Sequence, residues 1–344
     1  MSDINARARA VCRILVIRPN HRLGNNVLLT PLLSELEALF PGAEVEVLTG
    51  GGAAKQVFAG FKRVTTVHAF PNWSFIRPHT VFAILQRIRK SRYDLAIDAS
   101  ARSRSGRFLL GLVTARYRIG YAWGSAWRDR CLSHAVVRGG EPPHMALTAA
   151  HLVRAALSRE LSLPASVDGP PLLDVRVAQG ERAEARALLS RVLVRSGGAA
   201  LSEAAAADGR VLVSLYPFAT AAKNYPEKWW LQVAAGLRAL SPRIDVVEIV
   251  PGDGRPRLQG EVPALYSTRI RELAAVIGQS RLFVSGDCGV MHLGSAAGAQ
   301  VLGLFKVTDP SIYAPYGRGS EGYAATDDDP SAVVQRAATL LGLT

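Results

Sequence analysis

The chain has 344 residues, of which 49% are hydrophobic and 20% are charged, so the composition excludes a disordered protein. This length exceeds one ordinary core and predicts two domains. Lysine and arginine outnumber aspartate and glutamate 41 to 28, a net charge of +13. Such a surface attracts phosphate groups in nucleotides, nucleic acid or anionic lipid, although an arginine-rich composition also arises without any partner.

The sequence carries no signal for a membrane or for disulfides. No apolar run reaches the roughly 18 residues of a membrane span, and the opening MSDINARARAVCR lacks the apolar core of a signal peptide. Cys12, Cys131 and Cys288 lie far apart, with no CxxC pair. We therefore expect a cytoplasmic protein without a zinc site.

In the first half of the chain, apolar runs alternate with amphipathic stretches. They read in order CRILVIR, VLLTPLLSELEALF, AEVEVLTG, VFAILQRIRKS and YDLAIDAS. Strands that alternate with helices are typical of βαβ units in a parallel sheet. Residues 1–165 are therefore predicted to form a Rossmann-like N-terminal domain.

A break separates the two halves. Residues 166–209 contain a Pro/Gly stretch and a run of small residues on either side of one helix-like segment, AQGERAEARALLSRVLV. A loss of alternation with Pro and Gly is typical of connecting segments. We interpret this region as a linker with one helix.

A second alternation begins after the break. RVLVSLYP, IDVVEIVPGDG, RLFVSGDCG and QVLGLFK read as strands, with helix-like segments between them. Residues 210–344 are therefore predicted to be a second Rossmann-like domain, whose last helix is free to pack back on the N-terminal domain. Ligands of such α/β sheets bind at the carboxyl ends of the strands, so we expect the chemistry on the loops that follow Ile17, Asp98, Leu215, Val250 and Val284.

The segment RLFVSGDCGVMHLGSAAG has the features of an anion site. Gly286 and Gly289 let the backbone approach a ligand, and a helix start favours a pyrophosphate. Asp287 can accept hydrogen bonds from sugar hydroxyls, and His292 can donate one. The alternative is structural: Asp287 as an N-cap and His292 as a packed core histidine.

The segment LYPFATAAKNYPEKWW places a lysine after a predicted strand. Lys223, with Thr220 beside it, is well placed to neutralise a phosphate, although a single lysine on a loop is also common as a solvated surface residue. Trp229 and Trp230 are predicted to pack the following helix and not to stack on a base.

These segments resemble glycosyltransferase family 9, the heptosyltransferases of lipopolysaccharide inner-core synthesis. The resemblance rests on LVIRPNHRLGNNVLLTPLLSELEALFPGAEVEVLTG, YDLAIDASARSRSG, RYRIGY, YPFATAAKNYPEKWW and above all SGDCGVMHLGSAAGAQVLGLFKVTDPSIYAPYG. It spans roughly residues 12–317. The last stretch is the most specific, because the D-[ST]-G-x-x-H core and the downstream T-D-P and P-[YW]-G elements are rarely met by chance.

The resemblance implies a GT-B fold, with two Rossmann-like doubly wound domains facing a central cleft. It implies an inverting transfer without metal, with no cofactor beyond the donor, usually ADP-heptose, which the C-terminal domain holds. The N-terminal domain holds an anionic, lipid-linked core sugar. The donor-binding positions that it implies here are Thr220, Lys223, Asp253, Thr268, Asp287, Cys288, Gly289 and His292.

The opening turn departs from the family pattern. Most members read L-G-D, with the aspartate as the general base, but here the turn reads Leu23-Gly24-Asn25. An amide cannot take a proton at neutral pH, so Asn25 occupies the catalytic position without supplying the base. Asn25 can orient the acceptor while Asp98 or His21 takes the proton, or a dissociative transition state can need little base assistance. A third possibility is binding without turnover.

Acceptor contacts are predicted at Gly24, Asn26, Arg102 and Arg104. The two arginines can grip phosphates or carboxylates bidentately, although solvated arginines are an equally good interpretation. Cys288 replaces a hydroxyl with a weaker hydrogen-bond partner, so the donor-sugar contact can differ from that of the family.

Partners beyond the substrates follow from the charge. The basic N-terminus, with Arg7, Arg9 and Arg13, favours peripheral contact with the cytoplasmic face of the inner membrane. A protein that binds sugar nucleotides without turnover is the competing function. Nucleic-acid binding has the charge in its favour but no motif, so we expect no nucleic-acid partner.

Overall fold

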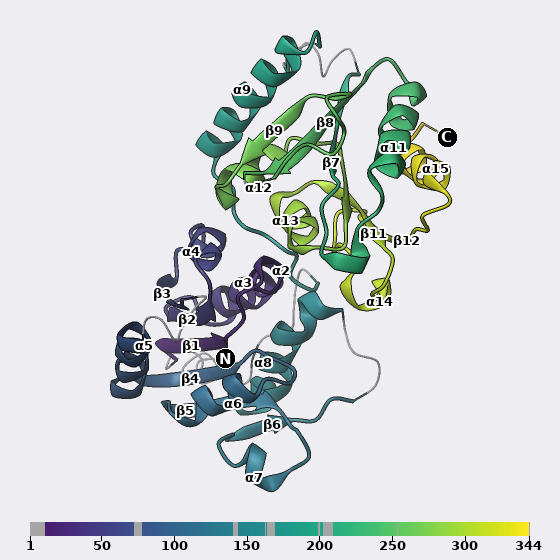
Figure 1. Ribbon diagram of the computed structural model, residues 1–344. Helices are drawn as coiled ribbons and strands as arrows, with labels where there is room; N and C mark the ends of the chain where they lie inside the picture. The colour runs from purple at the N-terminus through teal and green to yellow at the C-terminus, as the bar shows by residue number, and fades with distance from the viewer. Residues whose placement is uncertain are drawn as a thin grey trace. The chain divides into compact units, whose positions relative to one another are not determined.

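The computed structural model describes residues 11–71, 78–139, 144–161, 163, 169–198, 200–201, 209–252 and 254–343. The chain divides into two compact units, Met1–Leu172 and Leu173–Thr344, here called unit 1 and unit 2 (Figure 1). Among the described residues, no helix is both long and apolar enough to cross a membrane. Arg7 and Arg9 lie outside the described residues.

Unit 1 is built on a sheet of six strands in the order β3-β2-β1-β4-β5-β6, and every neighbouring pair is parallel. The central strand β1 reads RILVIR and is buried from its second residue on. A continuous apolar run is what a strand covered on both faces requires. The strands are β1 Arg13–Arg18, β2 Glu44–Gly50, β3 Val64–Phe70, β4 Arg92–Asp98, β5 Thr114–Tyr121 and β6 His134–Val136.

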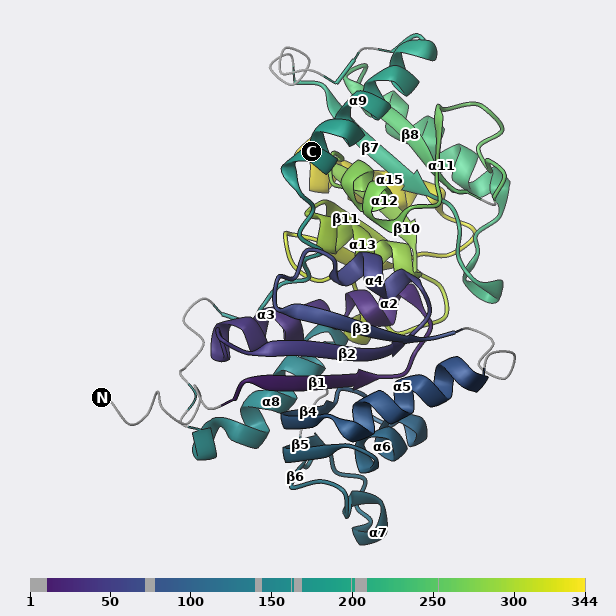
Figure 2. The ribbon, with the colours of Figure 1, turned by 90° about the vertical axis from the view of Figure 1, so that its left-hand side faces the viewer.

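Helices cover both faces of this sheet. Helix α3 packs against α8, while α6 contacts β1 and β4. Figure 2 shows α5 in front of the strands and α8 behind them. The helices are α2 Leu23–Val27, α3 Thr30–Leu39, α4 Ala53–Phe58, α5 Pro78–Lys90, α6 Arg104–Gly111, α7 Ala126–Asp129 and α8 Met145–Leu161.

The amphipathic stretch after β1 forms two helices. Helix α2 begins at Leu23, within the turn that reads Leu23-Gly24-Asn25, and α3 begins at Thr30 with Pro31 in its first turn. Proline has no N–H to donate to the preceding turn but fits the start of a helix. Pro31 therefore separates the short α2, which carries Asn25, from the longer α3.

Unit 2 repeats this architecture. Its six parallel strands have the order β12-β11-β10-β7-β8-β9. They are β7 Val211–Tyr216, β8 Ile244–Pro251, β9 Ala264–Ser267, β10 Leu282–Gly286, β11 Gln300–Phe305 and β12 Glu321–Ala324. Renumbered from its own first strand, this order is 6-5-4-1-2-3, the same as in unit 1 read from the other edge.

The helices of unit 2 also cover both faces. Figure 1 shows α11 and α15 on one side of the sheet and α9 and α12 on the other, and each of these two pairs is in contact. Trp229 and Trp230 on α11 are buried in the core, as predicted. The helices are α9 Gln179–Arg195, the 3-10 turn η1 Ala221–Lys223, α11 Glu227–Leu240, α12 Ile270–Ile277, α13 Gly289–Ala297, α14 Pro310–Tyr313 and α15 Pro330–Leu341.

Helix α9, in the region interpreted as a linker, is attached to unit 2. Arg271 on α12 donates to both carboxylate oxygens of Glu181, at 2.5 and 2.6 Å, and to the carbonyl oxygens of Val175 and Arg176. A bidentate guanidinium–carboxylate pair fixes orientation as well as distance.

The predicted fold class is confirmed: the chain is α/β, with two doubly wound Rossmann-like sheets. In such sheets the strand order reverses at one point, and the loops beside that point open toward a ligand. The reversal lies between β1 and β4 in unit 1 and between β7 and β10 in unit 2.

Candidate functional site

In unit 2 the loop after β7 carries Lys223 to the point where the strand order reverses. Lys223 ends the 3-10 turn η1, and its N–H donates to the carbonyl oxygen of Thr220. Ala221 in the same turn has φ +49°, in the left-handed region that non-glycine residues rarely adopt. Such strained residues concentrate at functional sites.

Asp287, which follows β10, lies opposite this loop. Its Oδ2 is 2.5 Å from Lys223 Nζ and also accepts a hydrogen bond from the Thr308 hydroxyl. Asp287 is almost fully buried, while the Lys223 side chain is 29% exposed. The structure therefore brings together the two predicted donor residues, with the lysine open to solvent.

Asn224 braces the lysine loop from several directions. Its Oδ1 accepts from the Ala219 N–H at 2.9 Å and from Arg257 at 3.2 Å. Its carbonyl oxygen accepts from Lys306 Nζ at 3.4 Å, and Lys306 also pairs with Asp327 at 2.6 Å. Three cationic side chains, Lys223, Lys306 and Arg257, thus converge on one loop, an arrangement suited to a ligand with several negative charges.

The predicted helix start is also present. Cys288 is the N-cap of α13 and Gly289 is its first residue, so the unpaired N–H groups of this nine-residue helix begin beside Asp287. The Cys288 thiol lies 3.6 Å from the Ser285 hydroxyl, and burial raises its pKa. His292 is buried on the same helix.

Of the remaining donor predictions, Thr268 lies at the carboxyl end of a strand. Thr268 is exposed just after β9. A Cβ atom on Gly252, at the end of β8, would come within 1.9 Å of the Thr268 methyl group, so Gly252 is the residue that lets these two strand ends meet. Asp253 lies outside the described residues.

In unit 1, Asn25 lies at the corresponding edge of the sheet. Arg18, the last residue of β1, donates to Asn25 Oδ1 at 2.8 Å and to the carbonyl oxygen of Ala99 at 3.2 Å. Arg18 therefore connects the Asn25 turn to the residue that follows Asp98. Because Asn25 Oδ1 accepts from Arg18, its amide N–H₂ is the group that faces other partners.

Asp98 at the end of β4 is fully buried. Its carboxylate accepts from Arg107 Nε at 3.2 Å and from the Ser100 N–H at 3.3 Å. Burial raises the pKa of Asp98 to about 6, against the opposing effect of the Arg107 charge. Arg107 also binds Asp129 at 2.7 Å and the Tyr121 carbonyl at 2.6 Å.

The other residues of the opening turn are held by the sheet. Asn26 is fully buried, and its Oδ1 accepts from the Thr49 hydroxyl at 2.7 Å. Gly24 is buried in α2. His21 is exposed, and its ring lies against Gly50. The predicted acceptor contacts of Gly24 and Asn26 stay predictions.

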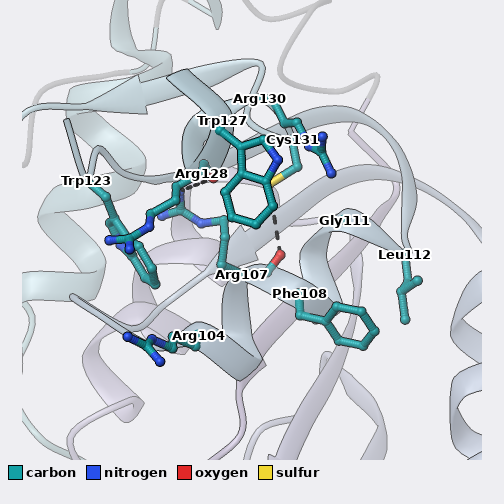
Figure 3. Close-up of a pocket in the computed structure, with 10 residues that line it drawn as sticks. All are labelled: Arg104, Arg107, Phe108, Gly111, Leu112, Trp123, Trp127, Arg128, Arg130 and Cys131. Carbon is teal, nitrogen blue, oxygen red and sulfur yellow. Dashed lines mark hydrogen bonds between the residues drawn. The ribbon is translucent and has the colours of Figure 1, made fainter. Parts of the chain in front are cut away.

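Arg102 and Arg104 line a cavity of about 280 Å³ together with Trp123 and Arg128. A second cavity of about 610 Å³ shares Arg104, Trp123 and Arg128 with it. Figure 3 shows these three residues at one end of the larger cavity, with Phe108 toward the other. The two predicted arginines thus stand at one site in unit 1.

Four further residues of the site, Thr308, Arg18, Arg107 and Lys306, were not predicted from the sequence. Thr308 lies within the T-D-P element that carried the resemblance, three residues beyond the end of β11, so its position in the loop after a strand was a usable signal. The role of Arg107 had no local signal, because its partners Asp98, Asp129 and Tyr121 come from three other segments. Among the described residues, no group of three or more His, Cys, Asp or Glu side chains forms a metal-binding arrangement.

Comparisons with known proteins bear on the family and the fold. Residues 258–340 match the model of glycosyltransferase family 9 (heptosyltransferase). No curated protein matches the chain. The match contains Asp287, Cys288, Gly289, His292 and Thr308, the half of the candidate site that follows β10.

Solved structures share the fold along nearly the whole chain. A glycosyltransferase family 9 protein from Veillonella parvula aligns with a TM-score of 0.73 at 16% identity, over 97% of this chain and 98% of its own. The E. coli heptosyltransferase WaaC with ADP aligns with a TM-score of 0.71 at 18% identity, over 95% of this chain and 99% of its own. E. coli ADP-heptose lps heptosyltransferase II aligns with a TM-score of 0.67 at 19% identity, over 96% of this chain and 98% of its own. The resemblance of this chain to the glycosyltransferase family 9 heptosyltransferases is therefore confirmed, by the family model over residues 258–340 and by the fold over both units.

Proposed function

We propose that this protein is an inverting, metal-independent glycosyltransferase that moves heptose from ADP-heptose to a lipopolysaccharide core or related glycan acceptor. The observation that carries the proposal is the cluster of Lys223, Asp287 and Thr308 where the strand order of unit 2 reverses. Structures of WaaC with ADP and with ADP-2-deoxy-2-fluoro heptose support the choice of donor.

The cluster fits the charge that develops when the bond from sugar to diphosphate breaks. The departing diphosphate gains negative charge, and a fixed cation stabilises that charge better in the transition state than in the bound substrate. Lys223, supported by Lys306 and by the start of α13, supplies that cation. Asp287 accepts hydrogen bonds from the sugar hydroxyls.

On the acceptor side, Asn25 orients the attacking hydroxyl. Its Oδ1 is held by Arg18, which fixes the amide and leaves its N–H₂ group to donate to the acceptor oxygen. Asp98 has a pKa suited to a base near neutral pH. Its burial and its contact with Arg107 favour a positioning role, so we propose a transition state that needs little base assistance, in which the proton of the acceptor hydroxyl passes to solvent water as the new bond forms.

The direct test compares Lys223→Met with Lys228→Met. Lys228 is an exposed lysine on α11, five residues further along. Loss of a fixed cation at the leaving group lowers turnover about 10²–10³-fold, so we expect that loss in Lys223→Met and a normal rate in Lys228→Met. Transfer from ADP-heptose, followed by release of ADP, is the measurement, and EDTA is expected to leave the wild-type rate unchanged.

The competing function is a protein that binds the sugar nucleotide without transferring the sugar, and the amide at Asn25 is the observation that favours it. A rise in melting temperature with ADP-heptose, with no ADP released in the presence of any lipopolysaccharide-type acceptor, would establish that alternative. An unchanged transfer rate in Lys223→Met would refute the role of Lys223 at the leaving diphosphate, and under the competing function an unchanged donor affinity would refute its contact with the phosphates.

A further inference from the structure

Helices α6 and α7 of unit 1 leave two large aromatic side chains in solvent. Phe108 is 65% exposed and Trp127 is 69% exposed. Both line the cavity of about 610 Å³ (Figure 3). Exposed apolar groups that gather at one place mark an interaction surface more often than scattered ones do.

Arginines line the same cavity as these rings. Arg104, Arg128 and Arg130 line the same cavity, and no aspartate or glutamate does. The Arg130 guanidinium lies 5.1 Å from the centre of the Trp127 ring. Within the described part of the chain, none of these three arginines forms an ion pair with a carboxylate. We call Arg104, Phe108, Trp127, Arg128 and Arg130 the α6–α7 surface.

Arg107 differs from these three arginines because it has carboxylate partners. It lies on α6 with Arg104 and lines the same cavity, but its guanidinium pairs with Asp98 and Asp129. Among the residues that the structure describes, Arg104, Arg128 and Arg130 have no such carboxylate partner, so their charges are available to an external anion.

We propose that the α6–α7 surface docks on an anionic phospholipid bilayer. Guanidinium groups bind phosphates bidentately, and aromatic rings favour the boundary between headgroups and acyl chains. A soluble anion would engage the arginines and leave both rings in water, whereas a bilayer satisfies the charges and the rings together. This inference does not depend on the proposed transfer reaction, because docking needs neither donor nor acceptor sugar.

The test is co-sedimentation of the full chain with vesicles of phosphatidylcholine, with and without phosphatidylglycerol. We expect binding to the anionic vesicles only, weakening as salt rises. Each arginine near such a surface contributes about fivefold to partition. Arg128→Gln with Arg130→Gln is therefore expected to weaken binding about 25-fold.

A matched control exists on α9 of unit 2. Arg191, Val194 and Arg195 are exposed there, so Arg191→Gln with Arg195→Gln removes the same charge from another face. An equal loss of binding in this control would show that net charge alone is responsible and would overturn the assignment. Equal binding to neutral vesicles, or no binding at all, would also overturn it.

The wild-type protein offers a readout that does not depend on how the arginine variants fold. Brominated phosphatidylglycerol quenches tryptophans that enter the bilayer boundary, so it is expected to quench the wild type strongly and Trp127→Phe much less. Equal quenching of the two proteins would contradict the docking geometry. Glycerol phosphate, added at the same concentration as the phosphatidylglycerol headgroups, is the soluble competitor. If it displaced the protein from the vesicles, a soluble anion would occupy the surface instead.

Discussion

The two units share one strand order but use the point of reversal differently. In unit 2 it carries Lys223 and Asp287, with the lysine partly open to solvent. In unit 1 it carries Asn25 and Asp98, and the carboxylate of Asp98 is fully buried against Arg107. Topology decides where polar groups gather, whereas exposure decides whether they meet a ligand or hold the scaffold.

Removing Arg107, which holds the buried Asp98 of unit 1, is expected to have the largest effect on stability. Arg107→Met leaves Asp98 buried without its cation, which costs about 3–5 kcal/mol of the free energy of unfolding. Urea unfolding measures this loss. The control is Arg104→Met on the same helix, whose exposed guanidinium has no carboxylate partner within the described residues, so its stability is expected to change little.

The double variant Arg107→Met with Asp98→Asn removes the stranded charge as well. It is expected to recover part of the lost stability, because the two side chains act on each other. If the two losses simply add, the Asp98–Arg107 pair is not what holds this part of unit 1 together.

The next largest effect is expected in the pH dependence of stability, which Asp98 of unit 1 controls. Burial raises the folded-state pKa of Asp98 from 3.8 to about 6. A raised carboxyl pKa gives stability that is present below the unfolded pKa and is lost as pH rises through the folded one. From about pH 4 to pH 6, the wild type is therefore expected to lose up to about 3 kcal/mol relative to Asp98→Asn.

Parallel stability curves for the two proteins over that pH range would contradict the burial of an ionisable Asp98. The same Asp98→Asn variant also tests the chemistry. Because the proposed transition state needs little base assistance, we expect an unchanged transfer rate at neutral pH, whereas a loss of 10²–10⁴-fold with unchanged stability would contradict that proposal.

The smallest expected effect lies in unit 2. Cys288 is the N-cap of α13, and its thiol faces the N–H groups of Val290 and Met291 as a weak acceptor, without a full capping hydrogen bond. Cys288→Ser supplies a hydroxyl that can accept from the helix N–H groups, a gain of about 0.5–1 kcal/mol in the free energy of unfolding. Thermal unfolding measures it, with Cys131→Ser as the control away from any helix start. A decrease would show that packing of the sulfur outweighs capping.

The sequence predicted the interior strands better than the edges. The runs CRILVIR and RLFVSGDCG correspond to β1 and β10, which lie between two neighbours and are almost continuously buried. The edge strands β3, β6, β9 and β12 were not predicted. They are short or partly exposed, such as the three-residue β6 and the four-residue β9, so they lack the apolar run that a covered strand needs.

In the candidate site, too, some features were predictable from the sequence and others were not. Lys223 and Asp287 were predictable because each follows an apolar strand and belongs to a recognisable motif. Their contact across 64 residues of chain was not, since only the sheet order brings β7 beside β10. Burial of Asp98 was likewise invisible, because it depends on Arg107 and the covering α6.

The short contact between Lys223 and Asp287 turns ligand binding into an exchange. Before a ligand arrives, the lysine already has one carboxylate as its partner, so an incoming phosphate has to replace that contact or share the lysine with Asp287. A second cation, Lys306, contacts the carbonyl oxygen of the neighbouring Asn224. The affinity for any anionic ligand is therefore expected to include the cost of loosening the Lys223–Asp287 pair.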